Sequence, residues 1–359
     1  MNELIPHITH KQLLKIDKDY EKAASLVNLV YVHDIEPGIN RIKKKTKYIY
    51  VYDEKEIKDT NELGRIQKLA IPPSWENVWI CPMENGHLQA TGLDLRKRKQ
   101  YRYHSLWHIL RNQTKYHRLY EFGTALPALR LSMEKDISGN VLNKEKVLAT
   151  ILSLMERTYI RVGNIEYEKS NGSYGLTTLK DRHAKIEKNT VTFSFKGKKG
   201  VYHSISLRNK KIAKIVKDCR DIPGKELFQY YDETGDRKVI DSGAVNQYIK
   251  EKTGQEFTAK DFRTWAGTLH ALHAFRSVSV AGTDTEKKKN IVEVLDLVSE
   301  KLGNTRTVCK KYYVHPGLIQ LYEEEKLQKY LKELDKIEKD DDQSGLTAEE
   351  KVLMKILKK

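Results

Sequence analysis

The pattern of apolar residues changes near residue 105, and this change restricts the available folds more than any other feature. Before it, short β-like runs such as YIYVYD and ENVWICP are separated by turn signals that include EPG and MENG. After it, long segments repeat apolar residues at helical spacing. A chain of 359 residues is also long for a single core. We therefore expect an α+β protein with a small mixed domain at 1–105, a larger and mostly helical domain at 106–337, and an acidic linker and short C-terminal helix at 338–359.

Helix signals in the second domain come with signals for the helix ends. The segment 144–163 repeats apolar residues at helical spacing, and Gly163 would suit its C-terminal cap. Gly303 would end a second helix in the same way. Pro316 can begin a further helix that runs through residues 318–334.

One segment within the helical part is typical of a β-hairpin. Val191, Phe193 and Phe195 alternate with polar residues, and the alternation resumes after the turn GKKG. This turn would place Lys198 and Lys199 at an exposed tip.

The excess of positive charge indicates an anionic partner. Lysine and arginine total 65 against 49 aspartate and glutamate, which gives a net charge of +16 and an isoelectric point near 9.4. Such a surplus, gathered on one face, attracts polyanions, and counterion release from DNA favours each phosphate contact. Nucleic acid is therefore the leading partner, although part of the surplus can serve only to keep the surface soluble.

The basic run at 94–104 mixes cations with residues that can read or stack on bases. Glutamine can bond to base edges, and tyrosine rings can stack on bases. A charge run that is only solvated would more often contain Glu and Ser. From this run we predict a nucleic-acid surface, which in a DNA-binding protein would make DNA contacts through Arg96, Lys97, Arg98, Lys99, Gln100, Tyr101 and Tyr103.

Several common sites lack their sequence signals. The chain has no P-loop, HExxH, CxxC or GxSxG pattern, so ATP binding, zinc hydrolysis and serine hydrolase chemistry lack their usual sequence signals. Scattered Asp and Glu could still bind Mg²⁺, although no compact acidic motif is present, and we expect no cofactor. No stretch approaches the roughly 20 apolar residues of a membrane span, and the first residues lack a signal-peptide pattern. The cysteines Cys81, Cys219 and Cys309 are odd in number and far apart, which fits a reducing cytoplasm.

The segment TVCKKYYVHPGL, at 307–318, sets two tyrosines beside two lysines. A tyrosine can attack a phosphodiester and form a phosphotyrosine that conserves the bond energy for resealing. Ionising a phenol at pH 7 costs roughly 4 kcal/mol, so this chemistry needs nearby cations. Arginines can also hold the phosphate oxygens, and a lysine can protonate the leaving oxygen. Because the chain has 20 tyrosines, a packing role for either residue stays open at this point.

Ordered motifs along the chain resemble type IB DNA topoisomerases of the bacterial and poxvirus-like branch. In the N-terminal part they are LGRIQKLAIPPSWENVWICP and GHLQATGLDLRKRKQYRYH. In the catalytic part they are YIRVGN, SYGLTTLKDRH, FKGKKG, AKDFRTWAGT and GNTRTVCKKYYVHP. The resemblance runs from about residue 30 to about residue 325.

The resemblance implies catalytic roles for five residues. Tyr313 would attack the phosphodiester, and Lys198 would act as general acid. Arg161 and Arg263 would hold the phosphate oxygens. Asn304 stands nine residues before Tyr313, where poxvirus and eukaryotic members carry histidine and the bacterial branch carries asparagine. An amide can donate a neutral hydrogen bond to phosphate but cannot transfer a proton.

The resemblance further implies a tyrosine-recombinase-like catalytic domain and a clamp of two domains around duplex DNA. The enzyme would relax supercoiled DNA through a transient 3′-phosphotyrosine, without ATP or metal, as a nucleoid-associated monomer in the cytoplasm. One alternative is a tyrosine recombinase or integrase, although these typically carry histidine where this chain has Lys260. The other is a DNA-binding clamp without catalytic activity, against which the complete set of catalytic residues argues.

Overall fold

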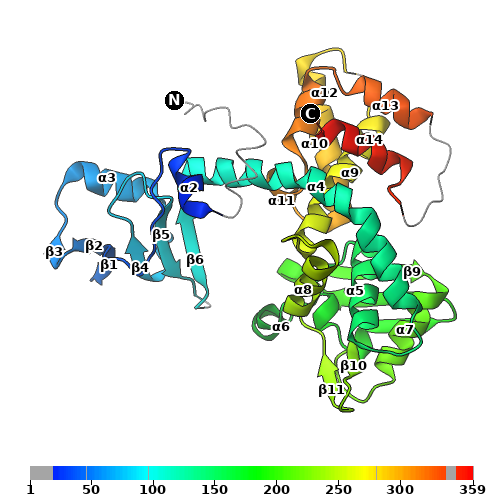
Figure 1. The fold of residues 1–359 in the computed structure, drawn as a ribbon. Coiled ribbons are helices and arrows are strands. Elements are labelled where there is room, and N and C mark those ends of the chain that lie inside the picture. Colours follow the sequence, from blue (N-terminus) through cyan, green and yellow to red (C-terminus); the bar gives the residue numbers. More distant parts are fainter. Residues whose placement is uncertain (1–18, 46, 96, 280, 337–344, 359) are drawn as a thin grey trace. The chain divides into compact units, whose positions relative to one another are not determined.

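The computed structural model describes residues 19–358 apart from 46, 96, 280 and 337–344, and the side chains of 112–115, 117 and 199 are also undescribed. The chain divides into two compact units, Met1–Arg118 and Leu119–Lys359 (Figure 1). The predicted DNA contact Arg96 and most of the predicted acidic linker lie outside the described residues.

The division between the units falls inside helix α4 (Ser105–Ser138). The first turns of α4 belong to the N-terminal unit because Trp107 and Leu110 share a core cluster with Ala23 and Ala24. The compact units therefore divide beyond residue 105, where the sequence analysis ends the first domain. As functional domains, the ranges predicted from sequence stay predictions.

The N-terminal unit is built on one antiparallel sheet with strand order β3-β2-β1-β4-β5-β6. Helix α3 packs on this sheet through Ile66, which is buried with Ile39, Val78 and Ile80. Strand β6 forms one edge. The elements are α2 (Tyr20–Ser25), β1 (Ile39–Lys44), β2 (Lys47–Tyr52), β3 (Lys55–Glu56), α3 (Thr60–Lys68), β4 (Glu76–Ile80), β5 (Leu88–Leu93) and β6 (Lys99–Tyr103).

The second unit is mostly helical and has one continuous core, which confirms the expected mixed α+β class. Its helices are α5 (Lys144–Thr158), α6 (Ile165–Asn171), α7 (Lys210–Arg220), α8 (Ser242–Thr253), α9 (Ala259–Ser277), α10 (Asp284–Leu302), α11 (Arg306–Tyr312), α12 (Pro316–Glu323), α13 (Gln328–Asp335) and α14 (Ala348–Leu357). Its strands are β7 (Ala184–Glu187), β8 (Thr190–Lys196), β9 (Tyr202–Arg208), β10 (Gln229–Tyr231) and β11 (Arg237–Val239). Within the described ranges, no helix is long and apolar enough to cross a membrane.

Local signals predict several of these elements correctly. Strands β8 and β9 form the expected hairpin, and the turn between them is a short 3-10 helix at Lys198–Gly200. Gly303 caps α10 with φ 59°, and Pro316 begins α12. The single helix predicted over 318–334 is wrong, because the chain breaks between α12 and α13, with Glu325 at φ 60°.

The predicted cap of α5 is also wrong. The helix ends at Thr158, and Tyr159 takes the left-handed conformation at φ 57°. Gly163 lies in the loop that follows, at φ 106°. A tyrosine in this conformation costs roughly 1 kcal/mol, so tertiary contacts must hold it there.

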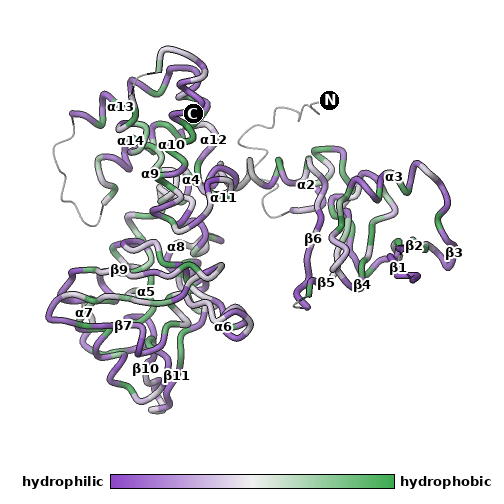
Figure 2. Tube along the Cα trace, turned by 180° about the vertical axis from the view of Figure 1, so that it is seen from behind, coloured by the Kyte–Doolittle hydropathy of each residue, from purple (hydrophilic) through white to green (hydrophobic). Residues whose placement is uncertain are grey.

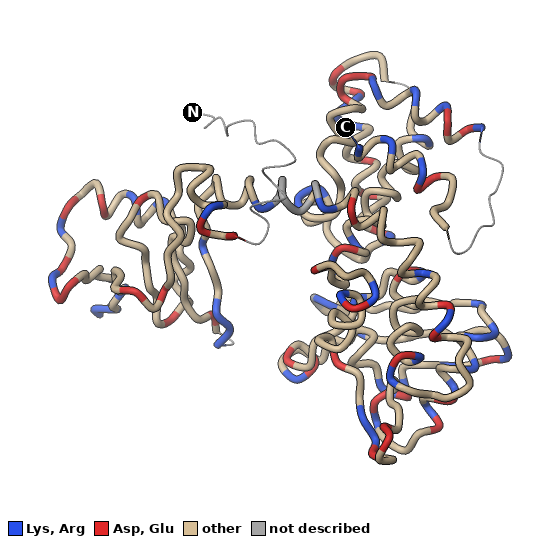
Figure 3. Tube along the Cα trace, viewed as in Figure 1, with Lys and Arg blue, Asp and Glu red and all other residues tan. Residues whose placement is uncertain are grey.

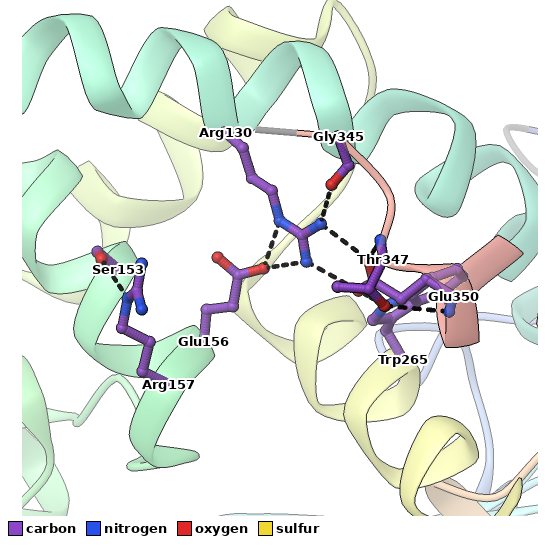
Figure 4. Close-up of polar contacts among 8 residues, drawn as sticks. All are labelled: Arg130, Ser153, Glu156, Arg157, Trp265, Gly345, Thr347 and Glu350. Atoms are coloured by element: carbon purple, nitrogen blue, oxygen red, sulfur yellow. Dashed lines mark hydrogen bonds and ion pairs between the residues drawn. The ribbon is translucent and has the colours of Figure 1, made fainter. Parts of the chain in front are cut away.

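A buried ion-pair network joins four helices of the second unit (Figure 4). Arg130 on α4 donates hydrogen bonds of 2.6 and 2.8 Å to Glu156 on α5 and bonds of 2.8 Å to both carboxylate oxygens of Glu350 on α14. Glu350 also accepts a 2.9 Å hydrogen bond from the Trp265 indole on α9. Because only 3% of the Glu350 side chain is exposed, its charge depends on these partners.

Replacing Glu350 with glutamine should destabilise the second unit. The change removes one charge from a buried pair, and the expected loss is roughly 3 kcal/mol in the free energy of unfolding at pH 7. Urea denaturation measures it. The control is Glu349→Gln, because the Glu349 side chain is 41% exposed and should change stability by less than about 0.5 kcal/mol.

The same comparison should depend on pH. Burial alone would raise the pKa of Glu350, but the hydrogen bonds and charge of Arg130 hold this pKa below its ordinary value. A carboxyl with a lowered folded pKa contributes stability above its unfolded pKa and loses it as the pH falls through the folded pKa. The gap between wild type and Glu350→Gln should therefore narrow in acid; a gap that stays constant down to pH 3 would contradict the assignment.

Candidate active site

Arg263 is held by the ends of two helices. Its guanidinium on α9 donates to the carbonyl of Tyr159, which caps α5, and at 2.7 Å to the carbonyl of Leu302, the last residue of α10. Such carbonyls lack partners within their helices and carry partial negative charge. Arg263 is only 6% exposed, and its buried Nε has no hydrogen-bond partner in the described structure. That N–H is therefore available to a bound anion.

Arg161 and Asn304 are joined by a hydrogen bond. The Nη2 of Arg161 donates to Asn304 Oδ1 and, at 3.0 Å, to the Gly303 carbonyl. Gly303 ends α10 in the left-handed conformation. The chain turns there, so that the Gly303 carbonyl and Asn304 lie beside Arg161. The structure thus places two of the predicted site residues in direct contact.

The two arginines are buried and fixed by hydrogen bonds in an arrangement that suits a bound anion. Burial, together with the positive charge of Arg263, lowers the pKa of Arg161 to about 10. The hydrogen bonds described for both guanidiniums go to carbonyl and amide oxygens rather than to carboxylates. Their charges therefore remain uncompensated by an acidic side chain in these contacts. A phosphate would supply the missing negative charge and accept the remaining N–H donors.

Tyr313 lies against Arg263. Its ring centroid is 5.2 Å from the Arg263 Cζ, and its backbone N–H donates at 2.9 Å to the Cys309 carbonyl in α11. Tyr312 has a different neighbour, since the Lys311 Nζ lies 5.4 Å from its ring centroid. The two adjacent phenols are therefore not equivalent, and Tyr313 is the one beside the buried arginine.

Lys198 stands at the exposed tip of the β8–β9 hairpin. Its Nζ lies 5.9 Å from the ring centroid of Tyr167 on α6. The structure thus gathers four of the five predicted catalytic residues into one cluster, and it places the fifth on the neighbouring hairpin.

Two further residues that the sequence analysis missed hold Tyr313 in place. The Thr268 hydroxyl lies 3.1 Å from the Tyr313 carbonyl and accepts, also at 3.1 Å, the backbone N–H of His315. A Cβ atom on Gly267 would lie 2.7 Å from the Tyr313 carbonyl oxygen and 2.9 Å from its Cβ. The only sequence signal for these contacts is that the small residues Gly267 and Thr268 follow Arg263 by about one helical turn.

The predicted DNA contacts gather on edge strand β6 and the turn before it. Figure 2 shows β6 as hydrophilic along its length, and Figure 3 shows lysine and arginine at the β5–β6 turn. Tyr101 and Tyr103 stack in parallel with centroids 5.8 Å apart, and the Lys99 Nζ lies 5.7 Å from the Tyr101 centroid. Tyr101 is 47% exposed, so its ring is open to a ligand.

Three cations of this strand and turn, Lys97, Arg98 and Lys99, are paired with carboxylates. Lys99 pairs with Asp34 at 2.6 Å, and Lys97 pairs with Glu76. Asp94 accepts from Arg98 at 2.6 Å and from the Gln100 amide at 3.1 Å. The sequence analysis missed these acidic partners because two of them lie far away along the chain. A DNA phosphate would have to compete with each of them.

Within the described ranges, no group of three or more His, Cys, Asp or Glu side chains is placed to hold a metal ion. Two arginines and one tyrosine lie together in this site. Comparison with known proteins identifies the family of the chain. Residues 98–341 match the family described as eukaryotic DNA topoisomerase I, catalytic core, and residues 47–94 match the bacterial DNA topoisomerase IB N-terminal domain.

Individual relatives agree with the family match. The chain is 36% identical to DNA topoisomerase 1B of Acanthamoeba polyphaga mimivirus over 294 residues, which cover 80% of this chain and 88% of that protein. It is 23% identical to DNA topoisomerase 1B of Vaccinia virus (strain Copenhagen) over 233 residues, 64% of this chain and 71% of that protein. The chain belongs to the type IB DNA topoisomerase family, whose members are isomerases that act on DNA.

Replacing Gly267 with alanine should displace Tyr313 and slow its reaction. The new methyl would lie within 3 Å of Tyr313 backbone and Cβ atoms, and a shift of about 1 Å at a reacting group costs roughly 100-fold in rate. Single-turnover cleavage of a duplex measures the effect, while duplex affinity should stay unchanged. Gly64→Ala on α3 is the control, because nothing lies within 4 Å of its Cβ position. Equal cleavage rates in the two variants would contradict the proposed contact.

Proposed function

We propose that the chain relaxes supercoiled duplex DNA by transient cleavage of one strand through a 3′-phosphotyrosine on Tyr313. The observation that carries this proposal is the convergence of Arg263, Arg161 and Asn304 around Tyr313, with two guanidiniums that lack carboxylate partners in their described contacts. Family membership supports the reaction, and the geometry supports the assignment of residues.

In the forward step, the Tyr313 oxygen attacks phosphorus, the bond to the 5′ oxygen breaks, and the phenolic proton leaves to solvent. Arg161 and Arg263 donate to the nonbridging oxygens, where negative charge accumulates in the transition state. With an effective dielectric constant of about 20, opposite charges about 5 Å apart attract by about 3 kcal/mol. Each arginine would therefore stabilise the negative charge on the phosphate oxygens by an energy of this order.

Lys198 protonates the leaving 5′ oxygen. Its exposed position at the hairpin tip supports this role, because a residue on such a tip can reach DNA bound over the arginines. Asn304 donates an amide N–H to the phosphate while its Oδ1 continues to accept a hydrogen bond from Arg161. After rotation of the free 5′ end, the 5′ hydroxyl attacks phosphorus, expels the tyrosine and reseals the strand. The phosphotyrosine conserves the bond energy, so the cycle needs no ATP or metal.

The two units act as a clamp around duplex DNA in this proposal. Support comes from the net charge of +16 and from the exposed aromatic and basic side chains of β6. The clamp is a monomer and works at the nucleoid in the cytoplasm. A recombinase is disfavoured by the family match and by Lys260, which stands three residues before Arg263 where recombinases typically carry histidine.

Tyr313→Phe should abolish relaxation and leave duplex binding intact, because the substitution removes only the attacking oxygen. Tyr312→Phe is the matched control and should relax plasmid within a few-fold of wild type. Gel assays with supercoiled plasmid, excess EDTA and no ATP measure both. Relaxation by Tyr313→Phe together with loss in Tyr312→Phe would reverse the assignment, and site-specific strand exchange between two duplexes would favour a recombinase.

Lys99→Gln should reduce the salt dependence of duplex binding. A lysine that contacts phosphate contributes about one to the slope of log affinity against log salt, so the slope should fall by about one. Lys238→Gln on β11 is the control, since both lysine side chains are 47% exposed and paired with an aspartate. A slope unchanged in Lys99→Gln would show that this lysine stays with Asp34 in the complex.

A further inference from the structure

His203 on β9 faces the cluster of arginines, yet the mechanism above does not use it. It pairs across the hairpin with Phe195 on β8, and the two rings stack with centroids 5.3 Å apart and an interplanar angle of 29°. It also lines a cavity of about 750 Å³, together with Arg161 and Gly303. The imidazole therefore lies between the hairpin and the arginine site.

Two glycines make room for this ring. A Cβ atom on Gly197 would lie 2.6 Å from the Cδ2 and Nε2 atoms of His203, and one on Gly303 would lie 2.8 Å from its Cε1. Gly197 directly precedes Lys198, and Gly303 directly precedes Asn304. One side chain thus touches the backbone just before two of the proposed catalytic residues.

The surroundings keep this ring uncharged. Burial lowers the pKa of His203 below its ordinary value, and the positive charges of Arg161 and Arg263 lower it further. Glu300 and Lys301 line the same cavity with opposite charges. A neutral ring can pack beside the two arginines without adding a third positive charge to the site.

We propose that His203 is a positioning residue for strand cleavage, whose ring holds the Lys198 hairpin against the turn that carries Asn304. This inference rests on the proposed function, because it concerns how the general acid reaches the site. The ring stacks on Phe195 and lies close to the backbones of Gly197 and Gly303. Loss of the ring frees the hairpin tip, so Lys198 no longer meets the leaving 5′ oxygen reliably.

The step that depends on Lys198 is the departure of the 5′ oxygen, which takes a proton as its bond to phosphorus breaks. A 5′ sulfur in place of that oxygen leaves as a thiolate, which needs no proton near neutral pH. A variant that only misplaces Lys198 should therefore regain its rate on a substrate with a 5′-bridging sulfur. A variant that disturbs Tyr313 or the arginines should not.

The test measures single-turnover cleavage of two matched duplexes, one with a 5′-bridging oxygen and one with sulfur, by His203→Ala and His203→Phe. His203→Ala should cleave the oxygen substrate roughly 100-fold more slowly than wild type and the sulfur substrate within a few-fold of it. His203→Phe keeps a ring that can stack on Phe195 and should retain most of the oxygen rate. Wild-type rates in His203→Ala, or an equal loss on both substrates, would overturn the proposal.

A double substitution gives an independent readout and remains usable if His203→Ala folds poorly alone. Gly197→Ala places a methyl group where the His203 ring lies and should also slow cleavage of the oxygen substrate. Backbone strain would not explain this loss, because Gly197 has φ −91°, which alanine adopts readily. His203→Ala makes room for that methyl group, so the double variant should lose less activity than the two single variants together. Strict additivity would count against contact between the two residues. Cleavage of either substrate by Tyr313→Phe would instead refute the proposed function.

Discussion

The hydrogen bonds from Arg263 to the carbonyls of Tyr159 and Leu302 are the interaction on which the site depends. They fix a buried cation to the ends of α5 and α10, two helices of the same core. The left-handed conformation of Tyr159 follows from this arrangement, because it presents the carbonyl to the guanidinium. Arg161 lies two residues further on, so the same chain reversal positions both arginines. The arrangement of the two arginines therefore depends on the ends of α5 and α10.

The features that sequence predicts well are those that local chemistry decides. Gly303 ends α10 and the β8–β9 hairpin forms, because a cap glycine and an alternating pattern act within a few residues. Gly163 misled the prediction for α5, since the contact with Arg263 outweighs the usual preference for a glycine cap. The family motifs name the members of the cluster around Tyr313, but they do not reveal how it is held.

Long-range contacts account for what the sequence does not show. Thr268 and His203 lie close to Tyr313 and Gly303, and both contacts join residues that are far apart along the chain. The same holds for Asp34, which lies far from Lys99 in sequence and pairs with it across the N-terminal unit. A basic run therefore overstates the charge that its surface presents. In the proposed complex, a DNA phosphate would replace Asp34 beside Lys99, and the net gain in binding free energy would be smaller than for an unpaired lysine.

The ion-pair network around Arg130 also affects the order in which the second unit can fold during synthesis. Glu350 lies 220 residues after Arg130, and a ribosome adds roughly 5–20 residues per second, so about 10–40 s separate the synthesis of the two partners. During that interval Arg130 has only Glu156 from this network, and the Trp265 indole on the helix of Arg263 lacks its acceptor. The nascent chain therefore contains Arg161, Arg263 and Tyr313 before the core around them is complete. The mature packing of α9 is reached only after α14 has emerged from the ribosome and docked.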